Sequence, residues 1–184
     1  MKATQQLKDE HEGIKLMLTV METISKDLEK GRELNITHYE KIIEFIKGFA
    51  DKCHHGKEED ILFPEMENHG MSKEGGPIAV MLHEHQLGRD HIKSLSAALN
   101  LFKGGDKTAI NSIISSSMSY VNLLRNHIEK ENNILFIMAD KILDETEQSK
   151  IFDAFEKLEA EQIGIGKHEE YHSLLKELKS SYLQ

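Results

Sequence analysis

One ten-residue phrase occurs twice in this chain of 184 residues. The sequence reads HHGKEEDILF from residue 54 and HIEKENNILF from residue 127, with His, Lys, Glu, Ile, Leu and Phe in the same places. Each copy sets a His four residues before a Glu, His54 before Glu58 and His127 before Glu131. Imidazole nitrogens and carboxylate oxygens are ligands of iron, manganese and zinc, so the repeated pair is the first candidate for a metal site.

The spacing of these pairs predicts that they face the interior of a helical protein. Residues four apart lie on one face of an α-helix, with Cβ atoms about 5–6 Å apart. His127 and Glu131 share their face with Tyr120 and Leu124, and the first pair shares its face with apolar residues in the same way. A carboxylate buried there costs several kcal/mol unless it is paired or binds a metal. Two such carboxylates in matching positions therefore indicate that they have a functional role.

Two more His residues lie on apolar stripes of predicted helices. His11 aligns with Leu7 and Ile14, and His85 aligns with Met81. A single His of this kind is usually a hydrogen-bonded core residue, and a single His-x-x-x-Glu pair is common on helix surfaces. Together, however, these residues on four helices predict an inward-facing shell of nitrogen and oxygen ligands. The shell lacks Cys, which argues against a structural thiolate zinc site, and its two carboxylates could bridge two metal ions about 3.5–4 Å apart.

The segments that must position these residues are predicted to be helical, because their apolar residues recur with a helical period. We expect helices over residues 3–30, 37–68 and 77–104, from 106 to about 141, and over 144–184 with an interruption at 164–166. The signals for their ends are Gly31, a capping box of Thr37 with Glu40, a loop over 69–77, Pro77, Asp106, and a second capping box of Asp144 with Glu147. Short connections between long amphipathic helices predict one all-α domain, an up-down four-helix bundle over about residues 3–141 with a C-terminal helical extension over 144–184.

The motifs resemble those of the hemerythrin-like, HHE cation-binding family, whose signature is H…HxxxE…H…HxxxE. The phrases HHGKEEDILFP, HIEKENNILF, GGPIAVMLHEHQLGR and DEHEGI carry this resemblance, which covers most of residues 8–141. It implies a four-helix bundle around a non-haem centre of two iron ions with an oxo or hydroxo bridge; manganese or zinc would accept the same ligand atoms. By motif position, the implied ligands are His11, His54, Glu58, His85, His127 and Glu131, with the two Glu residues bridging.

The third helix departs from the pattern of the oxygen-carrying hemerythrins, which have a second His on this helix, four residues from the first. Here Arg89 stands four residues after His85, and Met81 stands four before it. The chain therefore resembles more the six-ligand branch linked to nitric-oxide stress, iron-centre repair and redox or iron sensing. The missing ligand would provide an open coordination position.

The C-terminal helix is a candidate source of a further imidazole. HEEYH at residues 168–172 fits the H-E-x-x-H signature of zinc proteases, but such sites need a third protein ligand and only twelve residues follow. We expect instead that the helix folds over the mouth of the bundle, where His168 could serve as a further metal ligand. The simpler alternative is a capping helix that packs through Leu174, Leu175 and Leu178.

Other residues allow alternative interpretations. His55 and Glu59 repeat the four-residue spacing one position along and would replace the first pair if the register were shifted, although only the preferred register matches the second phrase. His83 and His91 are expected to be partly exposed or to donate hydrogen bonds to ligands. Cys53, which lacks an evident base, is expected to be an inert thiol.

Composition narrows the class of partner. The net charge of −9 disfavours duplex nucleic acid and anionic membrane surfaces, and the apolar runs are too short to cross a bilayer. The polar N-terminus and the single Cys favour a reducing cytoplasm. The expected partners are a small diatomic ligand, O2 or NO, and a second copy of the chain in a homodimer.

Three functions fit these features. The first is a non-haem di-iron protein that handles or senses O2, NO or iron in redox or nitrosative stress. The second is a module that carries or stores O2 or iron without turnover. The third is a helical interaction protein whose His cluster binds a different metal or is incidental. Both an enzyme and a binding protein are therefore compatible with the sequence.

Overall fold

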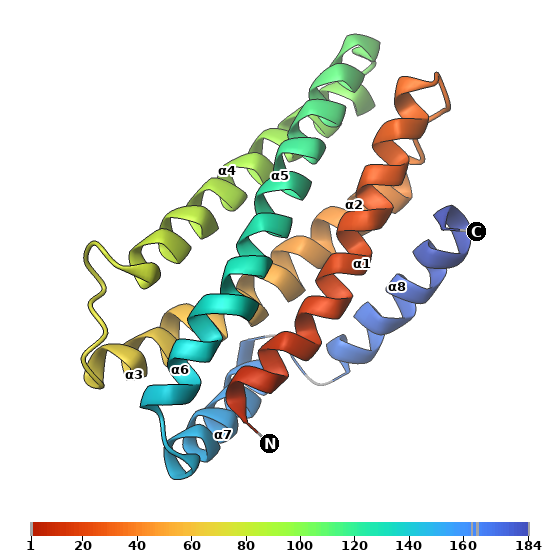
Figure 1. Ribbon diagram of the computed structural model, residues 1–184. Helices are drawn as coiled ribbons and strands as arrows, with labels where there is room; N and C mark the ends of the chain where they lie inside the picture. Colours follow the sequence, from red (N-terminus) through yellow and green to blue (C-terminus); the bar gives the residue numbers. More distant parts are fainter. Residues whose placement is uncertain (1, 163, 165, 184) are drawn as a thin grey trace.

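The structure, a computed structural model, describes residues 2–162, 164 and 166–183, with all of their side chains except that of residue 168. Every regular element in this part of the chain is a helix, which confirms the predicted all-α class. In Figure 1 the long helices of the bundle lie side by side and alternate in direction along the chain, and the C-terminal helices pack against them. The predicted up-down bundle with a C-terminal helical extension is therefore present.

The bundle helices are built from consecutive helical elements. The first is α1 (Ala3–Glu29). The second contains α2 (Ile36–Phe45), η1 (Ile46–His55), η2 (Glu58–Leu62) and α3 (Phe63–Asn68). The third is α4 (Pro77–Lys103), and the fourth follows the 3-10 turn η3 (Lys107–Ala109) with α5 (Ile110–Lys130), η4 (Glu131–Leu135) and α6 (Phe136–Ile142). The extension consists of α7 (Glu145–Gln162) and α8 (Lys167–Tyr182).

Local capping signals set several of the helix ends. The side chain of Asp106 accepts a hydrogen bond from the backbone N–H of Thr108 at 2.9 Å, so it caps the fourth bundle helix as predicted. Asp144 and Glu147 form the predicted capping box, in which each carboxylate accepts the other residue's backbone N–H, at 2.7 and 2.9 Å. Two orphan donors at the start of α7 are satisfied in this way.

The capping box predicted for Thr37 and Glu40 is wrong. Helix α2 begins at Ile36, and the side-chain oxygen of Asn35 accepts the backbone N–H of His38 at 3.1 Å. Asn is a stronger N-cap residue than Thr, so the helix begins one residue earlier than the sequence pattern predicted.

The second and fourth bundle helices widen into π-helical turns at the repeated phrases. The turns η2 and η4 begin at Glu58 and Glu131, which occupy the same place in the two phrases. A longer π-helical stretch, η1, ends at His55. Hydrogen bonds in a π-helix run from residue i to i+5, so each turn holds more residues than an α-turn and successive side chains point in more similar directions. Such turns occur frequently at functional sites.

The apolar core is divided into two clusters. One contains Leu18, Phe49 and Leu124, and the other contains Phe63 and Phe136. In the first three bundle helices the candidate ligands fall between residues of one cluster and residues of the other, and in the fourth Glu131 does so, one turn after His127. The polar layer is therefore enclosed by apolar side chains at both ends.

The extension covers the outside of the bundle. Helix α7 packs through Ile151 and Phe155 against the cluster that contains Phe63, and α8 packs through Leu175 and Leu178 against the other cluster. Among the described helices, none is long and apolar enough to cross a membrane.

Candidate metal centre

Six of the seven predicted ligands lie together in the polar layer between the two apolar clusters. All six are at most 1% exposed, and they are His11, His54, Glu58, His85, His127 and Glu131. The seventh, His168, lies at the start of α8, and its side chain is outside the described part of the chain. The buried contacts of α8 through Leu175 and Leu178 are those of the simpler alternative, a capping helix.

The imidazoles form two pairs. The Nε2 atoms of His11 and His54 are 2.9 Å apart, and those of His85 and His127 are 3.1 Å apart. Two nitrogens bound at right angles to one cation, each at about 2.1 Å, would be about 3.0 Å apart. Each pair therefore has the spacing of two ligands on a single cation.

Both carboxylates reach both imidazole pairs. Glu131 places one oxygen 2.9 Å from Nε2 of His127 and the other 3.2 Å from Nε2 of His11. Oε2 of Glu58 lies 3.4 Å from Nε2 of His85 and 3.8 Å from Nε2 of His54. All four oxygens of the two carboxylates are buried. Apart from these close contacts with Nε2 atoms, they have no hydrogen-bond partner within the described residues. Buried carboxylate oxygens without such partners are expected where a cation binds.

Each imidazole is oriented by a hydrogen bond at its outer nitrogen, Nδ1. The Nδ1 atoms of His11, His54, His85 and His127 lie 2.7–2.9 Å from side-chain oxygens of Asn132, Glu10, Glu59 and Glu84, respectively. This contact fixes the ring and leaves Nε2 directed at the cluster, as in many metal sites. Helical periodicity in the sequence does not indicate these partners, because they do not lie on the apolar stripes.

The hydrogen-bond partners of the imidazoles reveal a pseudo-twofold relation between the first two bundle helices and the last two. Glu10 and Glu84 each precede a candidate ligand in sequence and bind the imidazole of the next bundle helix, and each also binds a Lys of the repeated phrase, Lys57 and Lys130. Asn132 and Glu59 each follow a candidate carboxylate and bind the imidazole of a neighbouring bundle helix. Two features of the sequence could have indicated these partners. One is the Lys that both phrases share, and the other is the Glu that directly precedes His11 and His85.

Charges within the cluster alter its acid–base behaviour. Burial and the neighbouring charge of Glu131 raise the pKa of Glu58. Burial also opposes ionisation of Glu131, but His127 and His11 outweigh it and hold its pKa well below the usual range. Burial opposes protonation of His85 and His127 too, yet the surrounding carboxylates raise the pKa of His85 to about 11 and that of His127 to about 9. Protons therefore occupy sites that a cation would take.

His55, predicted only as an alternative to His54, is a further buried imidazole. The structure retains the preferred register, because Glu58 faces the cluster whereas Glu59 lies outside it and accepts from His85. Nevertheless His55 is only 3% exposed, and its ring stacks on that of His85 with centroids 3.9 Å apart. Burial and the charge of His85 hold the pKa of His55 well below its usual value.

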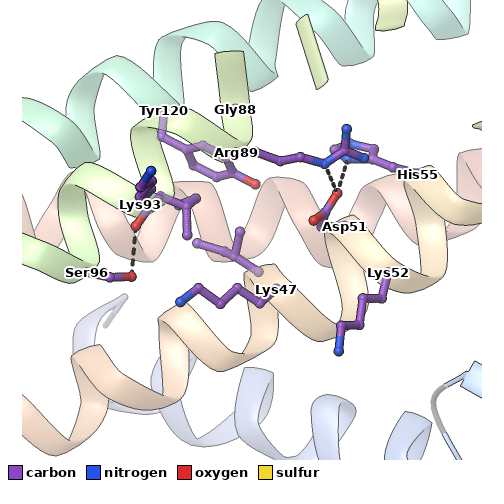
Figure 2. A pocket seen from close by; sticks show the side chains of 11 residues that line it. Lys47, Asp51, Lys52, His55, Gly88, Arg89, Lys93, Ser96 and Tyr120 are labelled. Carbon is purple, nitrogen blue, oxygen red and sulfur yellow. Dashed lines mark hydrogen bonds and ion pairs between the residues drawn. The ribbon is translucent and has the colours of Figure 1, made fainter. Parts of the chain in front are cut away.

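A cavity of about 440 Å³ opens beside His55. Figure 2 shows His55 and Arg89 approaching the carboxylate of Asp51 from the same side, with Tyr120 and Lys side chains also lining the cavity. Burial alone would raise the pKa of Asp51, but hydrogen bonds from His55 and Arg89 lower it to about 2. The carboxylate of Asp51, which lines the cavity, is therefore charged at neutral pH.

Cys53 lies in a third polar cluster, with Glu10 and Glu159. The ammonium of Lys57 lies 2.5 Å from Glu10 and 2.7 Å from Glu159, so a side-chain cation already neutralises these carboxylates. Burial raises the pKa of Cys53 to about 12. The thiol therefore stays protonated, in agreement with the prediction that it is inert.

The fold and the cluster together define a helical bundle with an interior site of the kind that binds metal cations. The chain belongs to the hemerythrin family, because the model of the Hemerythrin HHE cation binding domain matches residues 2–139. The resemblance that the motifs indicated is therefore confirmed.

A curated relative is the iron-sulfur cluster repair protein YtfE of Dickeya chrysanthemi (strain Ech1591). The two sequences are 33% identical over 88 residues, which are 47% of this chain and 40% of that protein. The match thus spans less than half of either chain. No solved structure is significantly similar to the chain.

Proposed function

We propose that this protein is a non-haem di-iron protein that handles or senses O2, NO or iron under redox or nitrosative stress. The observation that carries the proposal is the pairing of four Nε2 atoms at 2.9 and 3.1 Å around two carboxylates whose four oxygens have no other hydrogen-bond partner within the described residues. Family membership supports a cation at this site. The name of the YtfE relative supports a role in iron chemistry.

In this proposal each imidazole pair holds one iron. His11 and His54 would bind the first, His85 and His127 the second, and Glu58 with Glu131 would bridge them. Such a centre, when bound, supplies redox chemistry and a place for a diatomic ligand. The donor set is nitrogen and oxygen alone, which suits iron and would also accept manganese or zinc.

The chain's own contribution is to orient the ligands and to exclude water. Phe136 stacks on His11 with ring centroids 5.6 Å apart, and Phe63 stacks on His85 at 6.1 Å. These rings belong to the apolar cluster on one side of the centre. In such surroundings a small uncharged molecule such as O2 or NO is favoured over ions, because burying an unpaired charge is costly.

Metal loading tests the proposal. Protein purified without chelators and loaded with ferrous iron should retain about two irons per chain and show a visible absorption band after oxidation. Glu58→Gln and Glu131→Gln should each lose iron, whereas Glu129→Gln, an exposed neighbour in the fourth bundle helix, should not. Failure of the wild type to retain iron, or equal retention by all three variants, would overturn the proposal.

A second measurement separates handling from carriage. Reduced, loaded protein is exposed to NO and, separately, to O2, and the gas consumed is compared with the amount of protein. Consumption beyond one equivalent, or transfer of iron to an apo-protein, supports handling. A reversible spectral change without consumption of gas supports a carrier or a sensor.

A further inference from the structure

His55 directly follows His54, one of the candidate ligands. Adjacent residues of an α-helix point about 100° apart, so His54 and His55 would not normally both face one interior site. Here they end the π-helical stretch η1, and they are 1% and 3% exposed. The wide turn therefore turns both rings inward.

His55 is oriented in the same way as the four paired imidazoles. Its Nδ1 lies 3.4 Å from Oδ1 of Asp51, as each of the others has an oxygen partner at Nδ1. Its Nε2 is buried and has no hydrogen-bond partner within the described residues. A polar atom in that situation is unfavourable unless something else binds it.

The surroundings of His55 place it on one side of the centre. His55, Glu58, His85 and His127 each offer one ligand atom, and these atoms all lie within 4.8 Å of one another. His11, His54 and Glu131 form a separate set of the same kind. The imidazole of His55 is therefore close to the pair of His85 and His127.

Arg89 connects the two carboxylates that bind the stacked imidazoles of His55 and His85. Its guanidinium donates to Asp51 at 2.9 Å and to Glu59 at 2.6 Å, and these carboxylates bind Nδ1 of His55 and Nδ1 of His85. Figure 2 shows Arg89 and His55 meeting at the same carboxylate of Asp51. One side chain thus fixes the direction of both imidazoles.

We propose that His55 is a fifth imidazole ligand, bound through Nε2 to the cation held by His85 and His127. The proposal rests on the proposed function, since it assigns one more ligand to that centre. The two cations then carry three and two imidazoles. The cation held by His85 and His127 would then have one more imidazole ligand from the protein than the cation held by His11 and His54.

The test uses the whole chain loaded with ⁵⁷Fe. His55→Phe keeps an aromatic ring against His85 but removes the nitrogen, and His55→Gln serves as a second variant if the first does not fold. His83→Gln, on the exposed face of α4, is the control. Circular dichroism establishes that each variant is folded before loading.

Mössbauer spectra and iron affinity give readouts that do not depend on activity. The wild type should show two quadrupole doublets of equal area, and the His55 variants should alter one and leave the other unchanged. Affinity for one of the two irons should fall at least about tenfold, because loss of even an outer partner of a ligand costs about that much. A His55 variant with the doublets and affinities of the wild type would overturn this inference alone. A wild type that binds no iron would overturn the proposed function as well.

Discussion

Lys57 provides a sharp test of how the polar layer is held together. Its side chain is fully buried, and its ammonium lies 2.5 Å from Glu10 and 2.7 Å from Glu159 of α7. Glu10 in turn accepts from Nδ1 of His54 at 2.8 Å. The chain of contacts therefore connects the extension to a candidate metal ligand. We expect Lys57→Met to interrupt this chain of contacts between Glu159 and Glu10.

The expected loss of unfolding free energy in Lys57→Met follows from the distances between the charged groups. At an effective dielectric constant of about 20, opposite unit charges about 2.6 Å apart attract by about 6 kcal/mol, so two contacts offset a desolvation cost of several kcal/mol for each ion. Removal of Lys57 leaves Glu10, which is 6% exposed, without its cation. Breaking a buried pair in this way typically costs about 3–5 kcal/mol of unfolding free energy, which is the loss we expect.

The loss of unfolding free energy in Lys57→Met should become smaller as the pH falls. Burial opposes ionisation of Glu10, but His54 and Lys57 outweigh it and lower its pKa in the folded state. A lowered carboxyl pKa contributes stability above the unfolded value of about 4.3, and this contribution is lost as the pH falls. Without Lys57 the pKa of Glu10 should lie higher in the variant than in the wild type, so the contribution of Glu10 to the difference in stability should shrink as the pH falls from that higher pKa through the lowered pKa of the wild type.

Urea unfolding followed by circular dichroism, with chelator present, measures the loss. Lys52→Met, an exposed position in η1, is the matched control and should stay within about 0.5 kcal/mol of the wild type. Combining Lys57→Met with Glu10→Gln should recover part of the stability, since the uncompensated charge is gone. A loss below about 1 kcal/mol for Lys57→Met, or strict additivity in the double variant, would refute the reasoning.

Three further predictions follow from single contacts. A Cβ at Gly48 would lie 1.9 Å from the hydroxyl oxygen of Tyr171, so Gly48→Ala should loosen α8, with thermal unfolding showing a loss of about 1–3 kcal/mol. Cys53 is 1% exposed and its pKa is about 12, so it should react with a thiol reagent only after denaturation, which mass spectrometry would detect. Despite burial, neighbouring carboxylates raise the pKa of His54 and bring those of His85 and His127 to about 11 and about 9, so metal-free protein at pH 7 should release at least about two protons on binding iron, measurable by calorimetry in buffers of different ionisation enthalpy.

The arrangement of the six predicted ligands could be read from the sequence because it depends on helical periodicity alone. His11 falls between Leu7 and Ile14, and all three side chains are buried in the same stripe of α1. His85 in α4 follows the same period, and in the second and fourth bundle helices the π-helical turns change the pitch near the repeated phrases while the predicted ligands stay buried. A one-residue error at a helix start, as at Thr37, does not alter which face of the helix is buried, so the wrong capping box did not change which residues were expected to face the interior.

The position of His55 could not be read in this way, because it depends on a change of helical pitch. Periodicity arguments assume 3.6 residues per turn, and η1 departs from that assumption at the residues next to the site. The partners of the imidazoles were missed for a different reason. Glu84 and Asn132 fall on polar faces that are indistinguishable in sequence from solvated ones, and only the packing of neighbouring helices brings them to Nδ1 of His127 and His11.

The pseudo-twofold relation also locates the difference between the two halves of the centre. The position of His55 in the first phrase is taken in the second by Ile128, which is equally buried but has no ligand atom. Two equivalent half-sites would bind two cations with equal strength and present equal faces to an incoming molecule. Any order of loading, or preference of a small ligand for one side, must therefore arise where the halves differ. His55 is such a place, and it lies beside the cavity that Asp51 and Arg89 line.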